Sequence, residues 1–155
     1  MKRIMFVCHG NICRSPMAEF IFKSLVSEGG LEGEFFIASC ATSTEEIWGG
    51  RGSPIYAPAA AELSRHGIPY CEREATLLLR SDYAKYDMFI GMDSANVRNM
   101  HRIFGGDPEG KISKLLDYTG RGGDVSDPWY SGRFDVAFSD IYEGCTALFE
   151  ILTNN

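Results

Sequence analysis

The chain has 155 residues, of which 45% are hydrophobic and 23% are charged. These values are ordinary for a globular domain and argue against both a disordered chain and a membrane protein. The formal net charge of -6 argues against nucleic-acid or anionic-membrane binding, because both rely on clustered positive charge. We therefore expect a single domain over residues 1–155 with no nucleic-acid or membrane partner.

The beginning of the chain and its cysteines bear on the cellular compartment. Two basic residues precede an apolar stretch at 4–7, but the polar residues from His9 onward end this stretch too early for a secretory signal. The five cysteines form no CxxC pair and leave one cysteine unpaired in any full disulfide scheme. We expect reduced thiols and a cytoplasmic location.

Strands and helices alternate along the chain. A buried strand is expected over 3–8, and a helix from Ser15 with Pro16 at its first position. The later expected elements are a strand at 34–41, a loop at 42–56, helices at 58–66 and 82–86, a strand at 88–92, a helix capped by Ser94, a strand at 111–115, a loop at 117–132 and a helix over 138–152. This order implies a parallel sheet with helices on both faces, and such sheets bind ligands at the carboxyl ends of their strands.

The loop from Cys8 to Ser15 follows the first expected strand and carries the candidate chemistry. It leads into a helix N-terminus, where free backbone N–H groups and the helix dipole favour an anion. Gly10 and Asn11 are residue types that adopt positive φ angles, which turn successive N–H groups inward to form a nest. Arg14 adds a planar guanidinium suited to two phosphoryl oxygens. We expect a phosphate-binding loop.

Cys8 is the candidate nucleophile within this loop. Its electropositive setting favours the thiolate, which we expect to attack phosphorus and form a phosphocysteine that water hydrolyses without a metal or cofactor. Ser15 is expected to cap the helix and to donate to the Cys8 sulfur. A lone buried cysteine is more often structural. A zinc site with Cys8, Cys13 and a histidine is disfavoured, because the spacing is not the usual zinc pattern and Arg14 would repel the ion.

A phosphatase also needs an acid to protonate the leaving oxygen and a base to activate water. Asp127 is the candidate, because the following Pro128 restricts it to an extended conformation. Trp129 and Tyr130 come next and would form a wall for a flat aromatic group. Taken alone, an Asp-Pro pair is more often a turn. Asp124 is the local competitor, but no proline and aromatic pair follow it.

Two segments resemble one known family. The segment Cys8 to Glu19, CHGNICRSPMAE, is similar to the active-site signature of the low-molecular-weight protein tyrosine phosphatases, and Asp127 to Tyr130, DPWY, resembles their acid loop. Segments at 39–43, 66–68 and 91–93 resemble further family landmarks in the same order. The resemblance implies a four-stranded parallel sheet in a flavodoxin-like three-layer sandwich. It also implies hydrolysis of phosphotyrosine in proteins or peptides, with Asp127 as acid and base.

The resemblance assigns supporting roles as well. It implies that Asn11 keeps the loop in its strained shape through hydrogen bonds with Ser39 and His66, while Ser15 assists the thiolate. Without the resemblance, His66 would read as an ordinary cation at the end of a helix. The expected phosphate-binding and supporting residues are His9, Gly10, Asn11, Ile12, Cys13, Ser15, Ser39 and His66, with phosphate or another oxyanion as the bound group.

Cys13 is the second thiol of the loop. In the family that this sequence resembles, a thiol here can form a disulfide with the nucleophile, which would inactivate Cys8 reversibly and protect it from further oxidation. The alternative is a small apolar side chain that packs under the loop. Both interpretations stay open from the sequence.

The segment at 45–56 departs from the family pattern, which has a compact loop with aromatic, glycine and proline residues beside the cleft. Here Trp48 would line the cleft opposite Trp129 and Tyr130, although an exposed or core position is almost as compatible with its type. Substrate preference is therefore left open at this segment.

Three other functions fit parts of the sequence. Protein arginine phosphatases share the loop but resemble a pattern with Thr in place of Ile12 and a less aromatic acid loop, so Ile12 and Tyr130 favour phosphotyrosine. Thioredoxin-coupled arsenate reductases need two further cysteines at a fixed spacing, which Cys40, Cys71 and Cys145 do not supply. A non-catalytic phosphate-binding module would leave the thiol and the Asp-Pro pair without a role.

Overall fold

The computed structural model describes residues 1–154 of the chain. Four parallel strands form one sheet in the order β2-β1-β5-β6. These strands are β1 (Lys2–Cys8), β2 (Phe35–Ala41), β5 (Met88–Gly91) and β6 (Ile112–Lys114). The predicted α/β domain with a four-stranded parallel sheet is thus confirmed, while the predicted domain boundary at residue 155 lies outside the described residues.

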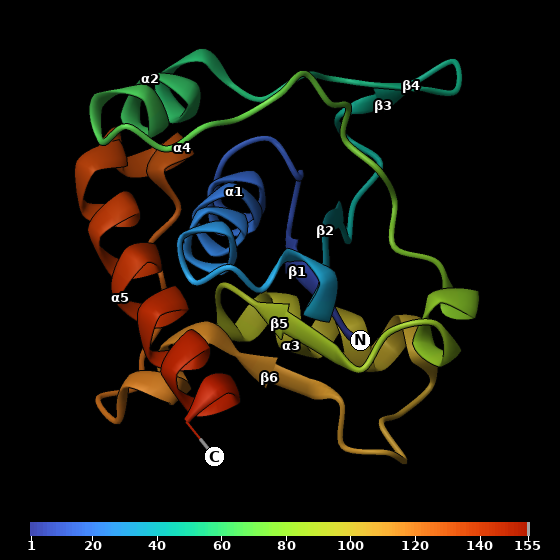
Figure 1. Cartoon of the computed structure of the whole chain (residues 1–155). Helices are drawn as coiled ribbons and strands as arrows, with labels where there is room; N and C mark the ends of the chain where they lie inside the picture. The colour runs from blue at the N-terminus through green and yellow to red at the C-terminus, as the bar shows by residue number, and fades with distance from the viewer. Residues whose placement is uncertain (155) are drawn as a thin grey trace.

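Helices cover both faces of this sheet (Figure 1). Helices α1 (Arg14–Glu28) and α5 (Phe134–Thr153) contact each other on one face. Helix α3 (Ser94–Phe104) packs on the other face against β5 and β6. Within residues 1–154, no helix combines the length and the apolar character that a membrane span requires.

The alternation of side chains along β1 supplies both halves of the core. Ile4 and Phe6 belong to the cluster that includes residues of α1 and α5, whereas Met5 and Val7 belong to the cluster that includes residues of α3. Successive residues of a strand point to opposite faces of the sheet, so a continuous apolar strand fits a sheet that is covered on both sides. The sequence of β1 therefore requires a three-layer arrangement.

The connecting segments contain more structure than the sequence indicates. The expected loop at 42–56 holds a small antiparallel hairpin, β3 (Ile47–Trp48) and β4 (Arg51–Gly52). The cap of α3 is Asp93 rather than Ser94, because the Asp93 carboxylate accepts the Asn96 N–H at 2.8 Å. The other elements are α2 (Ala57–Arg65), α4 (Pro128–Ser131) and 3-10 turns at Glu32–Glu34, Arg80–Ala84 and Leu115–Thr119.

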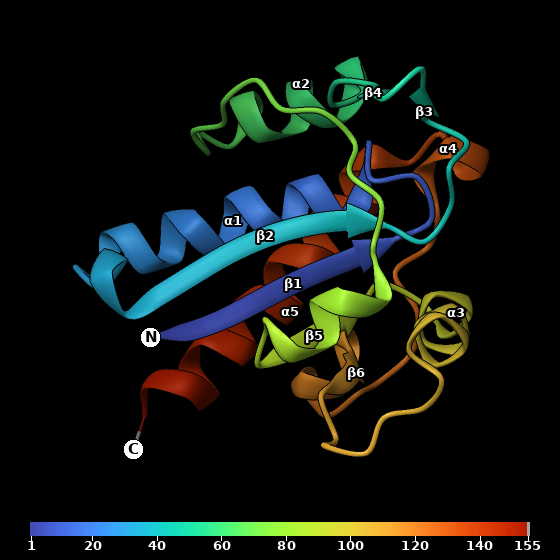
Figure 2. The same ribbon diagram turned by 90° about the vertical axis from the view of Figure 1, so that its right-hand side faces the viewer.

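The carboxyl edge of the sheet is where segments distant in sequence come together. Cys8 is the last residue of β1 and α1 starts at Arg14, so the phosphate-binding loop lies at this edge. Figure 2 shows the arrowheads of β1 and β2 pointing to the side where α4 and the β3–β4 hairpin lie. Parallel sheets offer ligand sites at this edge, because the loops after the strands converge there.

Candidate active site

A pocket opens at the carboxyl edge of the sheet, above the phosphate-binding loop. Three segments that are far apart in sequence form it, and all three residues expected to be catalytic face it. The lining residues are Cys8, His9, Gly10, Asn11, Ile12, Cys13, Arg14, Glu45, Glu46, Asp127, Trp129 and Tyr130.

The Cys8 sulfur lies among hydrogen-bond donors in the buried floor of this pocket. Its Sγ atom accepts the backbone N–H groups of Asn11 at 3.3 Å and Ser15 at 3.4 Å. The Ser15 Oγ atom is 3.0 Å from the same sulfur and accepts the Asn11 side-chain amide at 2.7 Å. Because Asn11 donates to this oxygen, the Ser15 hydroxyl hydrogen is free to point at Cys8. Such a ring of donors stabilises a thiolate and a sulfur leaving group.

Asn11 holds the shape of the phosphate-binding loop. It is fully buried, and in residues 1–154 it is the sole non-glycine residue with a positive φ, at 59°. Gly10, which was expected to share this conformation, has no positive φ, so the expectation for Gly10 is wrong. The Asn11 amide donates to Ser39 Oγ at 2.9 Å, as the family resemblance implies.

The expected contact between Asn11 and His66 is absent, and His66 lies elsewhere. The Asn11 Oδ1 atom accepts a hydrogen bond from Arg73 and another from the Thr76 backbone N–H. His66 follows the last residue of α2 and its ring stacks on Phe138 of α5, with centroids 4.0 Å apart. The stacking on Phe138 places the imidazole at the contact between α2 and α5. The assignment of His66 to loop support is therefore corrected.

Arg14 is fixed along one side of its guanidinium group. Its Nη1 atom donates to the Asp93 carboxylate and to the Val125 carbonyl, both at 2.8 Å. Burial acts to lower the pKa of Arg14, but the charge on Cys8 and the hydrogen bond to Asp93 outweigh it and raise the pKa overall. The side chain therefore stays charged and oriented while it lines the pocket. Sequence reasoning missed Asp93, which it treated only as part of a family landmark.

Asp127 enters the pocket from the start of α4. Its backbone is extended, at φ -79° and ψ 110°, as the following Pro128 favours. One carboxylate oxygen accepts the Trp129 N–H at 3.0 Å, and the other lies 3.5 Å from Arg14 Nη2. The carboxylate is thus oriented towards the same guanidinium that lines the phosphate-binding loop.

Asp124, the competing acid, is engaged outside the pocket. Its carboxylate accepts the Lys114 ammonium at 2.9 Å and the Ser94 hydroxyl at 3.2 Å. Burial acts to raise the pKa of Asp124, but the hydrogen bond from Lys114 outweighs it and lowers the pKa. A carboxyl group held in this way is a poor proton donor.

The two thiols of the pocket have different environments. Burial raises the pKa of Cys13 to about 12, and the charges of Cys8 and Asp127 act in the same direction. Cys13 is therefore protonated at neutral pH, whereas Cys8 lies among three hydrogen-bond donors. All five cysteines are free thiols in the structure.

Aromatic side chains mark one side of the pocket mouth. Trp129 and Tyr130 line the pocket and are 54% and 86% exposed, and Trp129 packs on Tyr56 with ring centroids 4.9 Å apart. Trp48 is 75% exposed and does not belong to the lining, so its assignment to the cleft is corrected. Its indole N–H donates at 2.9 Å to the carbonyl of Glu45, which lies just before the hairpin.

Two acidic residues of the same segment line the pocket, although Trp48 does not. Glu45 and Glu46 line the pocket, and the Glu45 carboxylate is 3.0 Å from His9 Nε2. No sequence pattern singled these residues out, because charged residues in a loop are usually solvated. Within the described part of the chain, no group of three or more His, Cys, Asp or Glu side chains is arranged to hold a metal ion.

Comparisons with known proteins agree on one family. The model of the low molecular weight phosphotyrosine protein phosphatases matches residues 3–155. The low molecular weight protein-tyrosine-phosphatase YfkJ of Bacillus subtilis is 35% identical, with 96% of this chain and 94% of the relative covered. The low molecular weight phosphotyrosine protein phosphatase of Schizosaccharomyces pombe is 37% identical, with coverages of 90% and 87%.

Solved structures show the same relationship. The crystal structure of YfkJ superposes with a TM-score of 0.93 at 33% identity, covering 99% of this chain and 96% of that one. The crystal structure of DARP, a Drosophila arginine phosphatase, superposes with a TM-score of 0.87 at 27% identity, covering 99% and 98%. From the family match, the two relatives and the geometry of the pocket, this chain belongs to the low molecular weight phosphotyrosine protein phosphatase family.

Proposed function

We propose that this protein hydrolyses phosphotyrosine in proteins or peptides, with Cys8 as the nucleophile and Asp127 as the general acid and base. The observation that carries the proposal is the single pocket in which a donor-ringed sulfur, the fixed guanidinium of Arg14 and the carboxyl group of Asp127 meet. In phosphoryl transfer, the sulfur serves as the nucleophile, the guanidinium binds the phosphoryl oxygens, and the carboxyl group transfers the proton.

In the first step, the Cys8 thiolate attacks phosphorus and forms an S–P bond while the P–O bond to the tyrosine breaks. Asp127, protonated beforehand, gives its proton to the leaving phenolate oxygen. Arg14 and the N–H groups of the loop stabilise the negative charge on the transferred phosphoryl oxygens. The products of this step are a tyrosine hydroxyl and a phosphocysteine.

In the second step, water attacks the phosphocysteine. The Asp127 carboxylate accepts a proton from this water as the O–P bond forms, and the S–P bond breaks. Cys8 leaves as a thiolate, which the Ser15 hydroxyl and two backbone N–H groups stabilise. Orthophosphate is released and Asp127 is again protonated for the next cycle.

The walls of the pocket support an aryl phosphate as substrate. Trp129 and Tyr130 offer flat apolar surfaces beside the entrance, and Ile12 contributes an apolar side chain from the loop. A phosphotyrosine ring between such surfaces would place its phosphate at Cys8. Phosphoarginine is the second candidate, because an arginine phosphatase shares the fold.

One substrate panel tests the proposal. The purified protein is assayed side by side with phosphotyrosine, phosphoserine and phosphoarginine peptides of one sequence, and with arsenate in the presence of a thiol reductant. We expect kcat/KM for phosphotyrosine to exceed each of the others by at least about 10-fold, because only an aryl group fills the aromatic entrance. Faster turnover of phosphoarginine or arsenate would refute the assignment of phosphotyrosine.

We also propose that Cys13 protects Cys8 by forming a reversible disulfide with it. We further propose that the protein acts in the cytoplasm, where its thiols are kept reduced. Peroxide would oxidise the Cys8 thiolate to a sulfenic acid, and the Cys13 sulfur would then form the disulfide as water leaves. The loss of the Cys8 negative charge would remove one cause of the raised Cys13 pKa. Mass spectrometry after mild peroxide should find a Cys8–Cys13 crosslink that a dithiol reverses, and a Cys8 sulfinic acid without any crosslink would contradict this.

A further inference from the structure

Arg73 contacts the phosphate-binding loop without lining the pocket. Its guanidinium donates to the side-chain oxygen of Asn11, and the backbone N–H of Thr76 donates to the same oxygen at 3.1 Å. Arg73 is not among the residues that face the pocket. It therefore acts on the loop from outside the substrate space.

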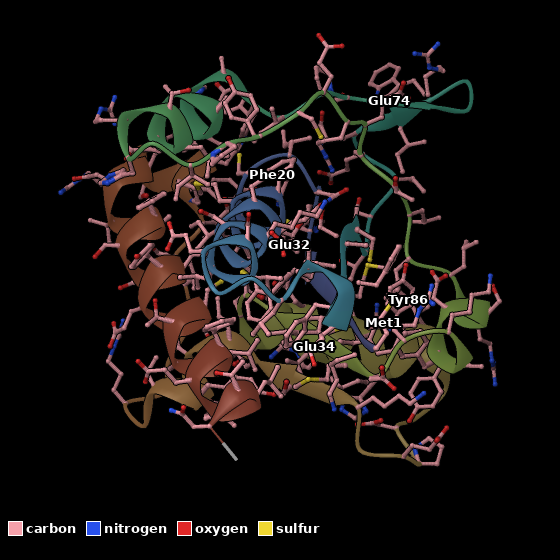
Figure 3. The ribbon with its side chains drawn as sticks, in the orientation of Figure 1. Met1, Phe20, Glu32, Glu34, Glu74 and Tyr86 are labelled. Atoms are coloured by element: carbon pink, nitrogen blue, oxygen red, sulfur yellow. The ribbon has the colours of Figure 1, made fainter. Side chains whose placement is uncertain are left out.

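The residues that directly follow Arg73 are anchored to β2 and to the segment of the β3–β4 hairpin. The Ala41 N–H, at the end of β2, donates to the Thr76 carbonyl at 2.7 Å, and the Ala75 N–H donates to the Ser53 carbonyl at 2.8 Å. Glu74 lies beside the β3–β4 hairpin (Figure 3). Because these bonds fix the three residues that follow Arg73, they anchor the segment from which its side chain reaches Asn11.

Arg73 reaches Cys8 through Asn11. The φ of 59° at Asn11 lies in the left-handed region, which asparagine adopts more readily than other residues with a Cβ atom and in which its side-chain hydrogen bonds hold it. Held in place, Asn11 directs its backbone N–H to the Cys8 sulfur and its side-chain amide to Ser15. Two of the three donors to the sulfur thus depend on the orientation of Asn11.

The Arg73 guanidinium has few partners of its own. Its Nη1 atom is buried without a hydrogen-bond partner, and within residues 1–154 no carboxylate forms an ion pair with this side chain. Burial lowers the pKa of Arg73, and the charges of Glu19 and Cys8 oppose this lowering. Arg73 is thus a partly buried cation whose single side-chain hydrogen bond in the described part of the chain goes to Asn11, which points to a role at that residue.

We propose that Arg73 is a positioning residue of this active site, which holds Asn11 in its left-handed conformation and so keeps the donors that depend on Asn11 directed at the Cys8 sulfur. The proposal rests on the proposed phosphatase function for its kinetic consequence. Its effect on the reactivity of Cys8 needs no turnover and is measured separately.

The experiment compares Arg73→Gln, Arg73→Lys and a matched control, Arg51→Gln. Gln removes the charge and is two atoms shorter, so its amide falls short of Asn11, whereas Lys keeps the charge and a donor of nearly the same reach. Arg51, in the neighbouring hairpin, forms an exposed ion pair with Glu74. The Arg51→Gln variant therefore shows the effect of losing a nearby arginine that does not contact Asn11. All variants carry Cys71→Ser, which removes the exposed thiol. The readouts are kcat and KM for p-nitrophenyl phosphate, and the pH dependence of Cys8 alkylation by iodoacetamide.

We expect Arg73→Gln to lower kcat by about 10- to 100-fold, the range for loss of a hydrogen bond to a charged group, with KM within about 2-fold. The midpoint of Cys8 alkylation should move to higher pH in this variant. Arg73→Lys should keep the midpoint near that of the parent and recover part of kcat, and Arg51→Gln should match the parent in both readouts.

An unchanged kcat and an unchanged alkylation midpoint in Arg73→Gln would overturn the proposal, even if that variant melted at a lower temperature. Should Arg73→Gln not fold, Arg73→Met decides, because a parent-like kcat and alkylation midpoint in a side chain without any donor would equally refute the locking of Asn11. Failure of the parent to hydrolyse p-nitrophenyl phosphate would refute the proposed function instead, and the alkylation midpoints would still test Arg73.

Discussion

The floor of the pocket and its mouth differ in how their side chains are held. In the floor, Cys8, Asn11, Arg14 and Ser15 are at most 3% exposed, and each is hydrogen-bonded to another part of the site. At the mouth, Tyr130 and its neighbours are largely exposed and have few partners. The difference indicates that the chemistry is fixed by a buried network, while substrate preference depends on side chains that are free to vary.

Burial explains why the floor tolerates little change. A buried polar group that loses its partner retains the full cost of desolvation, so a substitution at one position affects the others. The mouth carries no such constraint, since water replaces any contact that is lost. Substitutions should therefore affect kcat in the floor and mainly KM at the mouth.

Removal of the nucleophile is the strongest test of the floor. Cys8→Ser should bring turnover of p-nitrophenyl phosphate below detection, because a serine hydroxyl in this site is a far weaker nucleophile than a thiolate. Binding of phosphate or vanadate, measured by calorimetry, should persist since Arg14 and the loop remain. The exposed Cys71 offers the control, and Cys71→Ser should keep the parent rate. Turnover of Cys8→Ser near the parent rate would show that the floor does not work through the thiol.

Loss of the acid should have the next largest effect. Asp127→Asn can still accept the Trp129 N–H at the start of α4, but it cannot transfer a proton. We expect a decrease in kcat of about 10² to 10⁴-fold for substrates with poor leaving groups, and a smaller decrease for p-nitrophenyl phosphate. Asp124→Asn is the matched control and should leave kcat unchanged. An equal decrease for all leaving groups would argue against proton transfer by Asp127.

At the mouth, we expect smaller effects, which differ between two tryptophans. Trp129→Ala should raise KM for a phosphotyrosine peptide by about 2- to 10-fold, the value of one aromatic contact, with little change in kcat. Trp48→Ala should change KM by less than about 2-fold, because Trp48 lies outside the pocket lining. Steady-state kinetics with both variants compare the two positions directly. A larger effect at Trp48 than at Trp129 would reverse the assignment of the mouth.

The sequence predicted the floor better than the mouth for a physical reason. The loop from Cys8 to Ser15 is continuous in sequence, so its strand, its turn and its helix start are all visible in one segment. The orientation of the Arg14 guanidinium, by contrast, depends on its hydrogen bonds to Asp93 and Val125. These residues are about 80 to 110 positions away in the sequence, so no local pattern reveals them.

The support of Asn11 shows where the family resemblance was insufficient. It named His66, a histidine beside a glycine, whereas the structure places Arg73 at Asn11. Arg73 lies in a charged stretch that reads as a solvated loop, and only the path of the chain after α2 brings it to the site. The hairpin at 47–52 was missed in a similar way, because a pair of two-residue strands has no detectable period.

The central claim is that Cys8 carries the phosphoryl group during turnover. Asp127→Asn should slow hydrolysis of the intermediate, so rapid acid quenching of this variant with excess p-nitrophenyl phosphate, followed by mass spectrometry, tests the claim directly. We predict a phosphoryl group on the peptide that contains Cys8, formed in a burst about equal to the enzyme concentration. Steady release of p-nitrophenol with no phosphorylated Cys8 peptide would contradict the account.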